Sequence, residues 1–358
     1  MPVEAIRERT PTAKREHFET HRTLRGAYCA RVASVVLRVV DDTTEISIAD
    51  VHSADAGTVS IRVQRSALNY KDYLVSLPHS RVRRRDHLIL GVEACGVVTS
   101  SSDPSITEGS FVVAYGGDIG VGRDGGFSDH LVVPAQYVTV LDENIFTPET
   151  TMALGLAGYT AMASVLALEE HGLVPGAGPV VVTGASGGVG SLSVAILAQR
   201  GHRPVAVTGS PHHATWLREL GATDVIDRSA IGDREGRVLG SPRWAGAVDC
   251  VGGDTLSQIL RTLDYGAAVA ASGLVGGSEI STTVYPFITR AVQLIGIDAV
   301  ETPASIRQSV WRELGRVDLR RLDLVETTIG LSAVPEAIAV IGRGDTRGRW
   351  LVDVGVVD

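Results

Sequence analysis

Cysteine is scarce in this chain, and the cysteines it has stand far apart. Among 358 residues there are three, Cys29, Cys95 and Cys250. Their spacing excludes a Cys-x-x-Cys metal knuckle, and an odd number cannot form a closed set of disulfides. We therefore expect a reducing compartment and a cytoplasmic location, with Cys95 and Cys250 as small core residues of apolar strands.

Excess positive charge and long apolar runs are also lacking. The chain has 33 Lys and Arg against 41 Asp and Glu, a net charge of -8. Nucleic-acid binding needs a basic face, so we expect a small-molecule partner and no nucleic acid. Apolar runs such as residues 179–182 are much shorter than the roughly 20 residues of a membrane span, and we expect no membrane partner. Residues 1–26 show no signal-peptide pattern and are interpreted as an arm of unknown role.

The length suits two domains. Between residues 27 and 140, short alternating segments are broken by Gly, Asp and Pro, which is typical of a compact, mostly antiparallel, barrel-like β domain. The expected strands in this half include residues 33–40, 59–66, 91–98 and 111–115.

Helices and strands alternate from residue 148 onward. This order predicts a doubly wound parallel sheet with right-handed crossovers. The expected helices are residues 152–170, 190–200 and 213–220, and the expected strands are residues 179–183, 204–208, 224–227, 246–251 and 267–273. Helices 304–314 and 334–341 and a strand at 350–354 are expected to return to the first domain. The predicted fold class is therefore α/β, with domains at 27–147 plus 299–358 and at 148–298.

The expected turn between strand 179–183 and the next helix contains three regularly spaced glycines. Gly184, Gly187 and Gly190 permit a tight turn and let backbone N–H groups reach a pyrophosphate at the positive end of a helix. The spacing is G-x-x-G-x-x-G and departs from G-x-G-x-x-G, so a glycine-rich turn without a ligand is the alternative. The flanking strand and helix favour dinucleotide binding.

The end of the second strand of this sheet carries no carboxylate. Thr208, Gly209 and Ser210 stand where an acidic residue would bind the ribose 2′-hydroxyl of NAD. A 2′-phosphate is then not repelled, which favours NADPH. Since no arginine stands there, we expect positive charge from His212, His213 or Arg349, with solvated surface as the alternative for the two histidines.

Five segments in the same order resemble one known family, and they lie at 66–72 (Ser-Ala-Leu-Asn-Tyr-Lys-Asp), 155–162, 182–191, 244–249 and 283–288. Over roughly residues 27–354 the chain resembles the acryloyl-CoA reductase group of the quinone-oxidoreductase-like, zinc-free medium-chain dehydrogenases/reductases. The resemblance implies a GroES-like catalytic domain, a Rossmann domain, NADPH, a homodimer and reduction of a 2-enoyl thioester.

The resemblance also suggests where the cofactor lies. Thr160 is expected to face the nicotinamide carboxamide, unless its hydroxyl bonds back to its own helical turn. Residues 272–275, which follow a strand of the sheet, are expected along the nicotinamide side. The predicted cofactor contacts are Thr160, Ser186, Gly187, Gly188, Val189, Thr208, Ser210, Gly252, Ser272, Leu274 and Arg349.

Related zinc alcohol dehydrogenases place metal ligands where this chain has Asn69, Tyr70 and Val92. An amide, a phenol and an isopropyl group do not compete with thiolate and imidazole for zinc, so we expect no catalytic metal. Without zinc, alcohol oxidation would lack the Lewis acid that lowers the pKa of the alcohol hydroxyl. An activated alkene needs none, because its own carbonyl accepts the electron density that a hydride delivers.

The expected reaction is hydride transfer to the β-carbon of an α,β-unsaturated acyl thioester. Asn69 and the Tyr70 hydroxyl are the predicted donors to the enolate oxygen, with Tyr70 or a water as the proton source. Lys71 and Asp72 are expected to orient this group or to tune its pKa. The alternative for Asp72 is a helix cap.

The substrate stays open at this point. The basic run at residues 81–85 would meet the phosphates of coenzyme A or of a carrier protein's phosphopantetheine, or would be a solvated loop. Leu90, Ser210 and the loop 115–126 depart from the family pattern. An alternative is therefore an enone reductase or reductive cyclase of specialised metabolism that acts on a larger polyketide-like substrate. A second alternative is a non-catalytic NADPH-binding protein.

Overall fold

The computed structural model describes residues 33–40, 43–50, 58–232, 237–318, 326–344 and 346–355. The predicted arm at residues 1–26 and Cys29 lie outside the described residues. The described strands form three sheets, of three, six and seven strands.

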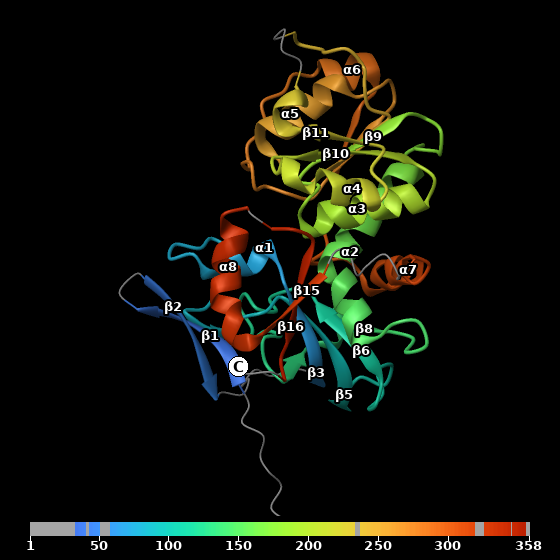
Figure 1. Ribbon diagram of the computed structural model, residues 1–358. Helices are drawn as coiled ribbons and strands as arrows, with labels where there is room; N and C mark the ends of the chain where they lie inside the picture. Colours follow the sequence, from blue (N-terminus) through green and yellow to red (C-terminus); the bar gives the residue numbers. More distant parts are fainter. Residues whose placement is uncertain are drawn as a thin grey trace, which may run out of the picture. The chain divides into compact units, whose positions relative to one another are not determined.

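The seven-stranded sheet is almost entirely antiparallel (Figure 1). Its strands follow the order β15-β16-β3-β5-β6-β8, and β7 pairs with β3 off this path. Only β15 and β16 run parallel. The three-stranded sheet has the order β2-β1-β4. The bounds are β1 (Ala33–Val40), β2 (Thr43–Asp50), β3 (Val59–Leu68), β4 (His87–Ile89), β5 (Glu93–Ser101), β6 (Phe111–Tyr115), β7 (His130–Val133), β8 (Val138–Val140), β15 (Glu326–Gly330) and β16 (Arg349–Asp353). The mostly antiparallel β half is thus confirmed.

The six-stranded sheet is parallel throughout and has the order β11-β10-β9-β12-β13-β14. This doubly wound order confirms the predicted Rossmann sheet. The bounds are β9 (Pro179–Val182), β10 (Arg203–Thr208), β11 (Asp224–Asp227), β12 (Gly246–Asp249), β13 (Ala268–Ala271) and β14 (Gln293–Gly296). Strands β12 and β13 end two residues earlier than expected, where the chain turns toward the pocket described below.

Helices cover both faces of this sheet. Figure 1 shows α3 (Gly188–Gln199) and α4 (Ala214–Glu219) on one face and α5 (Gly253–Thr262) and α6 (Tyr285–Arg290) on the other.

The side chains of β9 alternate between the two faces, as the pleat of a strand requires. Val180 and Val182 belong to the core cluster that includes α3, whereas Val181 packs with Leu260 of α5. Burial on both faces explains why this strand appears in the sequence as an uninterrupted apolar run.

Helix α2 (Pro148–Glu170) contacts both large sheets, touching β3 and β5 of one and β12 and β13 of the other. It is long and apolar enough for a membrane span. The search for uninterrupted apolar runs in the sequence did not find it, because glycine and threonine lie between its apolar residues. Most of its residues are buried inside the protein, so α2 is a core helix. Its backbone leaves the helical conformation at Gly155, with φ 50° and ψ -152°.

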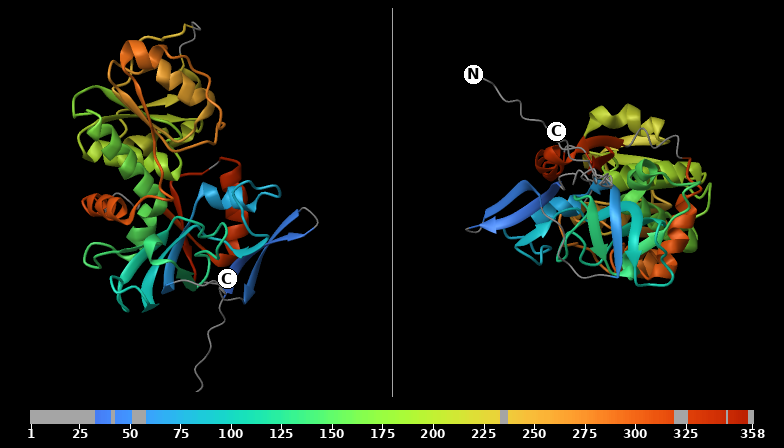
Figure 2. Two further views of the ribbon diagram at one scale, coloured as in Figure 1. Left: turned by 180° about the vertical axis from the view of Figure 1, so that it is seen from behind. Right: turned by 90° about the horizontal axis from the view of Figure 1, so that it is seen from below.

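Part of the last segment of the chain packs on the first half, as predicted, and part of it packs on α2. Helix α7 (Ala304–Leu314) lies beside α2 (Figure 2), and α8 (Val334–Gly342) contacts α1 (Tyr70–Ser76) and β3. Strand β16 pairs with β3 through Trp350, Leu351 and Val352. The exact domain boundaries stay a prediction.

Candidate active site

A pocket of about 490 Å³ lies at the carboxyl ends of β9, β10 and β12. One wall comes from the Rossmann sheet and the other from α1 and the segment that joins α8 to β16. The lining includes Leu68, Asn69, Tyr70, Ala157, Thr183, Gly184, Ser186–Gly190, Val207–Ser210, Arg228, Cys250, Val251, Thr255, Val275, Gly276, Ile341–Gly344, Thr346 and Gly348–Trp350. Ligands of doubly wound sheets bind at this edge.

The turn after β9 is shaped by its glycines. Gly184 has φ +57°, and a Cβ on Gly190 would lie 2.3 Å from the carbonyl oxygen of Gly184. Helix α3 begins here. Among the hydrogen bonds of the described residues, none is donated by the backbone N–H of Ser186, Gly188 or Val189. The turn therefore offers free N–H groups at the positive end of a helix, which suits a phosphate.

The end of β10 is linked to this turn by hydroxyl groups. Thr208 Oγ1 donates to Ser186 Oγ over 3.3 Å and accepts the N–H of Ser210 over 3.0 Å. No Asp or Glu occurs in the pocket lining within the described residues, and the lining contains the exposed Arg228 and Arg343. The pocket is thus built for an anionic ligand.

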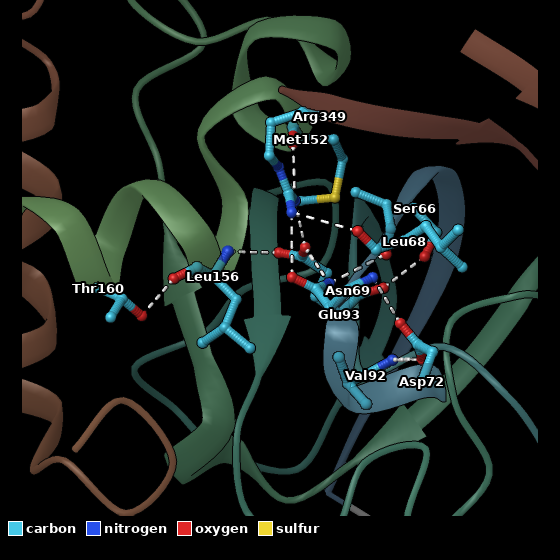
Figure 3. A network of polar contacts seen from close by, with 11 residues as sticks. Ser66, Leu68, Asn69, Asp72, Val92, Glu93, Met152, Leu156, Thr160 and Arg349 are labelled. Atoms are coloured by element: carbon cyan, nitrogen blue, oxygen red, sulfur yellow. Dashed lines mark hydrogen bonds and ion pairs between the residues drawn. The ribbon is translucent and has the colours of Figure 1, made fainter. Parts of the chain in front are cut away.

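A buried ion pair lies behind the pocket (Figure 3). Glu93 is 0% exposed, and its Oε1 accepts from Arg349 Nη2 over 2.5 Å and from Asn69 Nδ2 over 2.7 Å. Its Oε2 accepts the backbone N–H of Leu156 over 2.5 Å. One carboxylate thereby joins β5, β16, α1 and α2. Glu93 was missed as a site residue, and the signal for it was a lone charged residue in an apolar strand.

Gly155 makes this arrangement possible. A Cβ at this position would lie 2.3 Å from Glu93 Oε2 and 2.8 Å from Arg349 Nη2. The break in α2 also frees the N–H of Leu156 from the helical ladder, so that it donates to the carboxylate. The interruption of the helix therefore makes room for the ion pair and supplies one hydrogen bond to it.

The expected role of Arg349 as a cation for a 2′-phosphate needs correction. Besides Glu93, its guanidinium donates to Asn69 Oδ1 over 3.0 Å and to the carbonyls of Leu68 and Met152 over 3.3 and 3.2 Å. With 2% of the residue exposed, its charge is balanced by Glu93 inside the protein. His212 and His213 lie with their rings 4.0 Å apart and are not part of the described lining.

The expectation that Asn69 offers a donor to the substrate also needs correction. Its Nδ2 donates to Ala67 O over 3.1 Å and to Glu93 Oε1 over 2.7 Å, which uses both amide hydrogens. Its Oδ1 accepts from Arg349. Asn69 lines the pocket, but its amide holds the start of α1 in place.

Asp72 has the capping role that was its alternative. Its carboxylate is fully buried and accepts the N–H groups of Asn69 and Val92 over 2.8 and 3.1 Å. Burial raises the pKa of Asp72 to about 7, with a further contribution from Glu93, against the lowering effect of the backbone hydrogen bonds. Since Asp72 is not part of the described lining, it positions the neighbouring residues and does not contact the pocket.

Tyr70 remains as the donor that faces the pocket. Its side chain is partly exposed and lines the pocket, and its ring packs 5.5 Å from that of Tyr73. Among the hydrogen bonds of the described residues, none involves the Tyr70 hydroxyl. Partial burial, followed by the neighbouring Tyr73, raises the pKa of Tyr70, so the phenol stays protonated at neutral pH. The structure thus presents a free O–H group to the pocket.

Four predicted cofactor contacts lie outside the described lining, Thr160, Gly252, Ser272 and Leu274. Thr160 donates its hydroxyl to Leu156 O over 2.8 Å, as its alternative interpretation held. The Gly252 and Ser272 N–H groups donate to Asp249. The structure instead places Val251, Thr255, Val275 and Gly276 on the pocket wall. The predicted Ser186, Gly187, Gly188, Val189, Thr208 and Ser210 do line it together.

Cys250 differs from the expected core residue, because it is partly exposed and lines the pocket. Loss of solvation raises the pKa of its thiol, which argues against a nucleophile. The neighbouring Asp249 accepts from Thr183 Oγ1 over 2.7 Å and from Gly252 N over 2.8 Å, and so fixes this strand end. Cys95 is fully buried, as expected.

The basic run at 81–85 divides into two kinds of residue. Arg83 donates to the carbonyls of Val75, Leu77 and Pro78 and is almost fully buried, so it fits neither alternative, the phosphate contact nor the solvated loop. Arg81 and Arg84 are exposed.

In the described part of the chain, no group of three or more His, Cys, Asp or Glu side chains is arranged to hold a metal ion. The amide of Asn69 donates to Glu93, and the backbone N–H of Val92 donates to Asp72.

The fold and the pocket together define an α/β protein whose parallel sheet ends in a glycine-lined anion cradle, faced by a β-rich half. A family model for the alcohol dehydrogenase GroES-like domain matches residues 55–143, and one for zinc-binding dehydrogenase matches residues 188–316.

Curated relatives agree with these matches. The putative quinone oxidoreductase YhfP of Bacillus subtilis is 42% identical over 297 residues, which cover 82% of this chain and 89% of YhfP. The acrylyl-CoA reductase AcuI of Ruegeria pomeroyi is 42% identical over 311 residues, covering 87% of this chain and 93% of AcuI.

Solved structures agree as well. The structure of Escherichia coli K-12 YhdH with bound NADPH is 36% identical with a TM-score of 0.86, covering 90% of this chain and 99% of YhdH. That of Bacillus subtilis YhfP with NAD bound is 38% identical with the same TM-score, and covers 90% of this chain and 99% of YhfP. The chain therefore belongs to the medium-chain dehydrogenase/reductase family, as its motifs predicted, and is an oxidoreductase.

Proposed function

We propose that this protein is an NADPH-dependent reductase of the carbon–carbon double bond of an α,β-unsaturated acyl thioester. The observation that carries the proposal is the free Tyr70 hydroxyl, which shares one pocket with the glycine cradle after β9. A relative at 42% identity is named an acrylyl-CoA reductase, which supports this substrate class.

The residues present fit a dinucleotide. The free N–H groups of Ser186, Gly188 and Val189 would hold the pyrophosphate, and Thr208 and Ser210 lie where the adenosine ribose would be held. The absence of a carboxylate from the described lining favours NADPH. Related structures hold NADPH or NADP in two cases and NAD in another, so residues of this chain must set the preference. When bound, NADPH supplies the hydride that the β-carbon accepts.

The chain's own contribution is to polarise the thioester. Tyr70 donates its hydroxyl to the carbonyl oxygen, where negative charge develops as the β-carbon gains hydride. One such donor lowers the activation free energy by on the order of 3 to 4 kcal/mol. Tyr70 or a water then protonates the α-carbon. Glu93, Arg349 and Asn69 hold the start of α1, and therefore Tyr70, at a fixed position.

Turnover with a small panel of substrates tests the proposal. NADPH oxidation is followed with acryloyl-CoA, crotonyl-CoA, quinones and cyclic enones, and products are identified by mass. We expect consumption with the CoA esters and products heavier by two hydrogens. Activity only with a larger enone would support the specialised-metabolism alternative, and binding of NADPH without turnover would indicate a non-catalytic protein.

A contact with the phosphates of coenzyme A or of a carrier protein stays a prediction and now rests on Arg81 and Arg84, the exposed members of the basic run. Replacing both with alanine is expected to raise the KM for acryloyl-CoA, with little change in kcat. Replacing Arg218, an exposed arginine of α4 outside the described lining, is the control.

A further inference from the structure

Arg307 of α7 is a buried arginine without a carboxylate partner. The residue is 1% exposed, and among the ion pairs of the described residues none involves it. Removing a cation from water is costly unless other groups of the protein compensate its charge. Here Nη1 donates to Tyr115 O over 2.6 Å and to Tyr137 O over 3.4 Å, Nη2 donates to Thr302 O over 3.4 Å, and Cζ lies 4.5 Å from the centre of the Tyr115 ring. The guanidinium therefore joins backbone segments that are far apart in the sequence.

Two of these segments form turns that touch each other. They are residues 115–117, at the end of β6, and residues 298–302, after β14, and we call them the paired turns. Gly117 N donates to Val300 O over 3.1 Å. Gly116 has φ +99°, and a Cβ there would lie 2.5 Å from Val300 O. The turns therefore meet backbone to backbone, with no room between them for a side chain at Gly116.

Helix α7 anchors the first of the paired turns at two points. Arg307 and Trp311 stand one helical turn apart, so their side chains lie on the same face of the helix. Arg307 binds the Tyr115 carbonyl, and Trp311 Nε1 donates to the Tyr115 hydroxyl over 3.0 Å. Arg307 extends this anchor to the second turn through the carbonyl of Thr302.

The paired turns lie near the start of α1 and at the edge of the sheet where ligands bind. Strand β14 runs parallel to the other strands of its sheet, so residues 298–302 follow its carboxyl end at the edge that holds the pocket. In the pairing of β5 with β6, Tyr115 stands opposite Glu93. Glu93 in turn accepts from Asn69, which precedes α1.

Lys71 places the second of the paired turns beside Tyr70. Burial lowers the pKa of Lys71, and Asp298 and Glu301 are among the carboxylates that oppose this effect, so both lie within electrostatic reach of its ammonium group. The paired turns are not part of the described lining of the cofactor pocket. A substrate whose carbonyl oxygen meets Tyr70 needs room outside that lining, and the paired turns border the space next to it.

We propose that Arg307 is a positioning residue that fixes the paired turns as one wall of the site for the acyl substrate. The inference rests on the proposed function, because it requires an enoyl thioester beside Tyr70. Loss of the guanidinium lets the turns separate and weakens substrate binding, whereas hydride transfer and NADPH binding change little.

Steady-state kinetics with acryloyl-CoA and fluorescence titration with NADPH test the proposal. The ammonium of Arg307→Lys keeps the charge but cannot reach both turns at once. We expect its KM to rise about tenfold, with kcat and the Kd for NADPH changing less than about twofold. Arg312→Lys makes the same change at an exposed position of α7 and should leave all three constants unchanged. With acryloyl-pantetheine, which lacks the nucleotide of CoA, the ratio of variant to wild-type KM should stay the same, since the wall meets the acyl end.

A second variant separates the turns and keeps the arginine. In Gly116→Ala the added carbon meets Val300 O, so we expect KM to rise as in Arg307→Lys. Gly109→Ala is the control for backbone strain, since φ there is +85° and nothing lies within 4 Å of the added carbon.

The outcomes separate the two proposals. If the wild type consumes no NADPH with any acyl-CoA ester, the proposed function fails and this inference fails with it. If the wild type is active but both variants keep its KM, or if KM, kcat and the Kd for NADPH change together, only the role of Arg307 is overturned. Circular dichroism and the unfolding midpoint show whether each variant folds. If one does not fold, the other decides, and failure of both to fold would show a purely structural role and overturn the inference.

Discussion

Tyr70 and Tyr73 lie on the same helix with their rings in contact, but only Tyr70 lines the pocket. We expect Tyr70→Phe to lower kcat by about 100-fold or more, because a single donor to a developing oxyanion contributes that much. Tyr73→Phe is the matched control and should keep activity within a few fold. Steady-state kinetics with acryloyl-CoA measure both, and unchanged turnover in Tyr70→Phe would remove this residue from the mechanism.

Asp72 predicts a pH dependence of stability. Burial raises its pKa to about 7 in the folded protein, well above the ordinary 3.8. Between these values the folded state keeps a proton that the unfolded state loses. The contribution of Asp72 to stability is therefore complete below about pH 4 and is lost as the pH rises through 7.

Urea unfolding between pH 5 and 8 measures this effect. One proton changes the free energy of unfolding by at most about 1.4 kcal/mol per pH unit. Asp72→Asn removes the titrating group, so its curve should be flatter than that of the wild type. Parallel curves would show that Asp72 does not titrate in this range.

At the scale of elements, the break in α2 and the Glu93–Arg349 pair depend on each other. We expect Gly155→Ala to destabilise the protein by several kcal/mol, because a Cβ would meet Glu93 Oε2 and φ is +50°. Gly172→Ala is the control for backbone strain, since φ there is +97° but nothing lies within 4 Å of the added carbon. Denaturant unfolding measures the loss in the free energy of unfolding for both variants. An equal loss would mean that the contact of the added Cβ with the ion pair does not destabilise the protein.

The same ion pair predicts that substitutions of Glu93 and Arg349 have coupled effects on stability. Glu93→Gln leaves Arg349 as a buried cation without a counter-charge, which typically costs about 3–5 kcal/mol. A paired replacement, Glu93→Gln with Arg349→Met, should recover part of that loss because no charge is left unbalanced. Thermal unfolding compares the three proteins, and a double variant less stable than Glu93→Gln would contradict the coupling.

At the scale of the whole molecule, the homodimer is still a prediction. Strand β14 is the last strand of its sheet order. Exposed apolar side chains lie on this strand, on neighbouring α6 and on the N-cap of α6, namely Leu294, Tyr285, Ile288 and Val284. An edge strand with such a surface invites pairing with a second copy.

Light scattering after size-exclusion chromatography tests this surface. We expect a dimer for the wild type and a monomer for Ile288→Asp, in which a charge replaces a side chain that is 72% exposed. Val174→Asp introduces the same charge at an equally apolar exposed position away from β14 and should leave the dimer intact. A wild-type monomer, or a dimer in Ile288→Asp, would exclude this interface.

Much of the fold followed from neighbouring residues. Apolar alternation placed β1, β6, β11 and α7 at the observed bounds, because strand and helix periodicity are properties of short segments. The glycines at 184, 187 and 190 located the cradle for the same reason, since backbone conformation depends on local side chains. The ends of β12 and β13 were missed, because a strand stops where its tertiary partners stop.

The site was predicted less completely. The sequence by itself determined the Rossmann order, the glycine turn and the Asn-Tyr-Lys-Asp segment that brings Tyr70 to the pocket. Only the tertiary structure decided that the Asn69 amide is hydrogen-bonded to Glu93 and Arg349, which stand 256 positions apart in the sequence. It also decided that the Arg228 side chain lies over Gly209. The physical reason is that charge pairing and hydrogen-bond saturation depend on which distant side chains the folded chain brings within reach, and no local pattern encodes that.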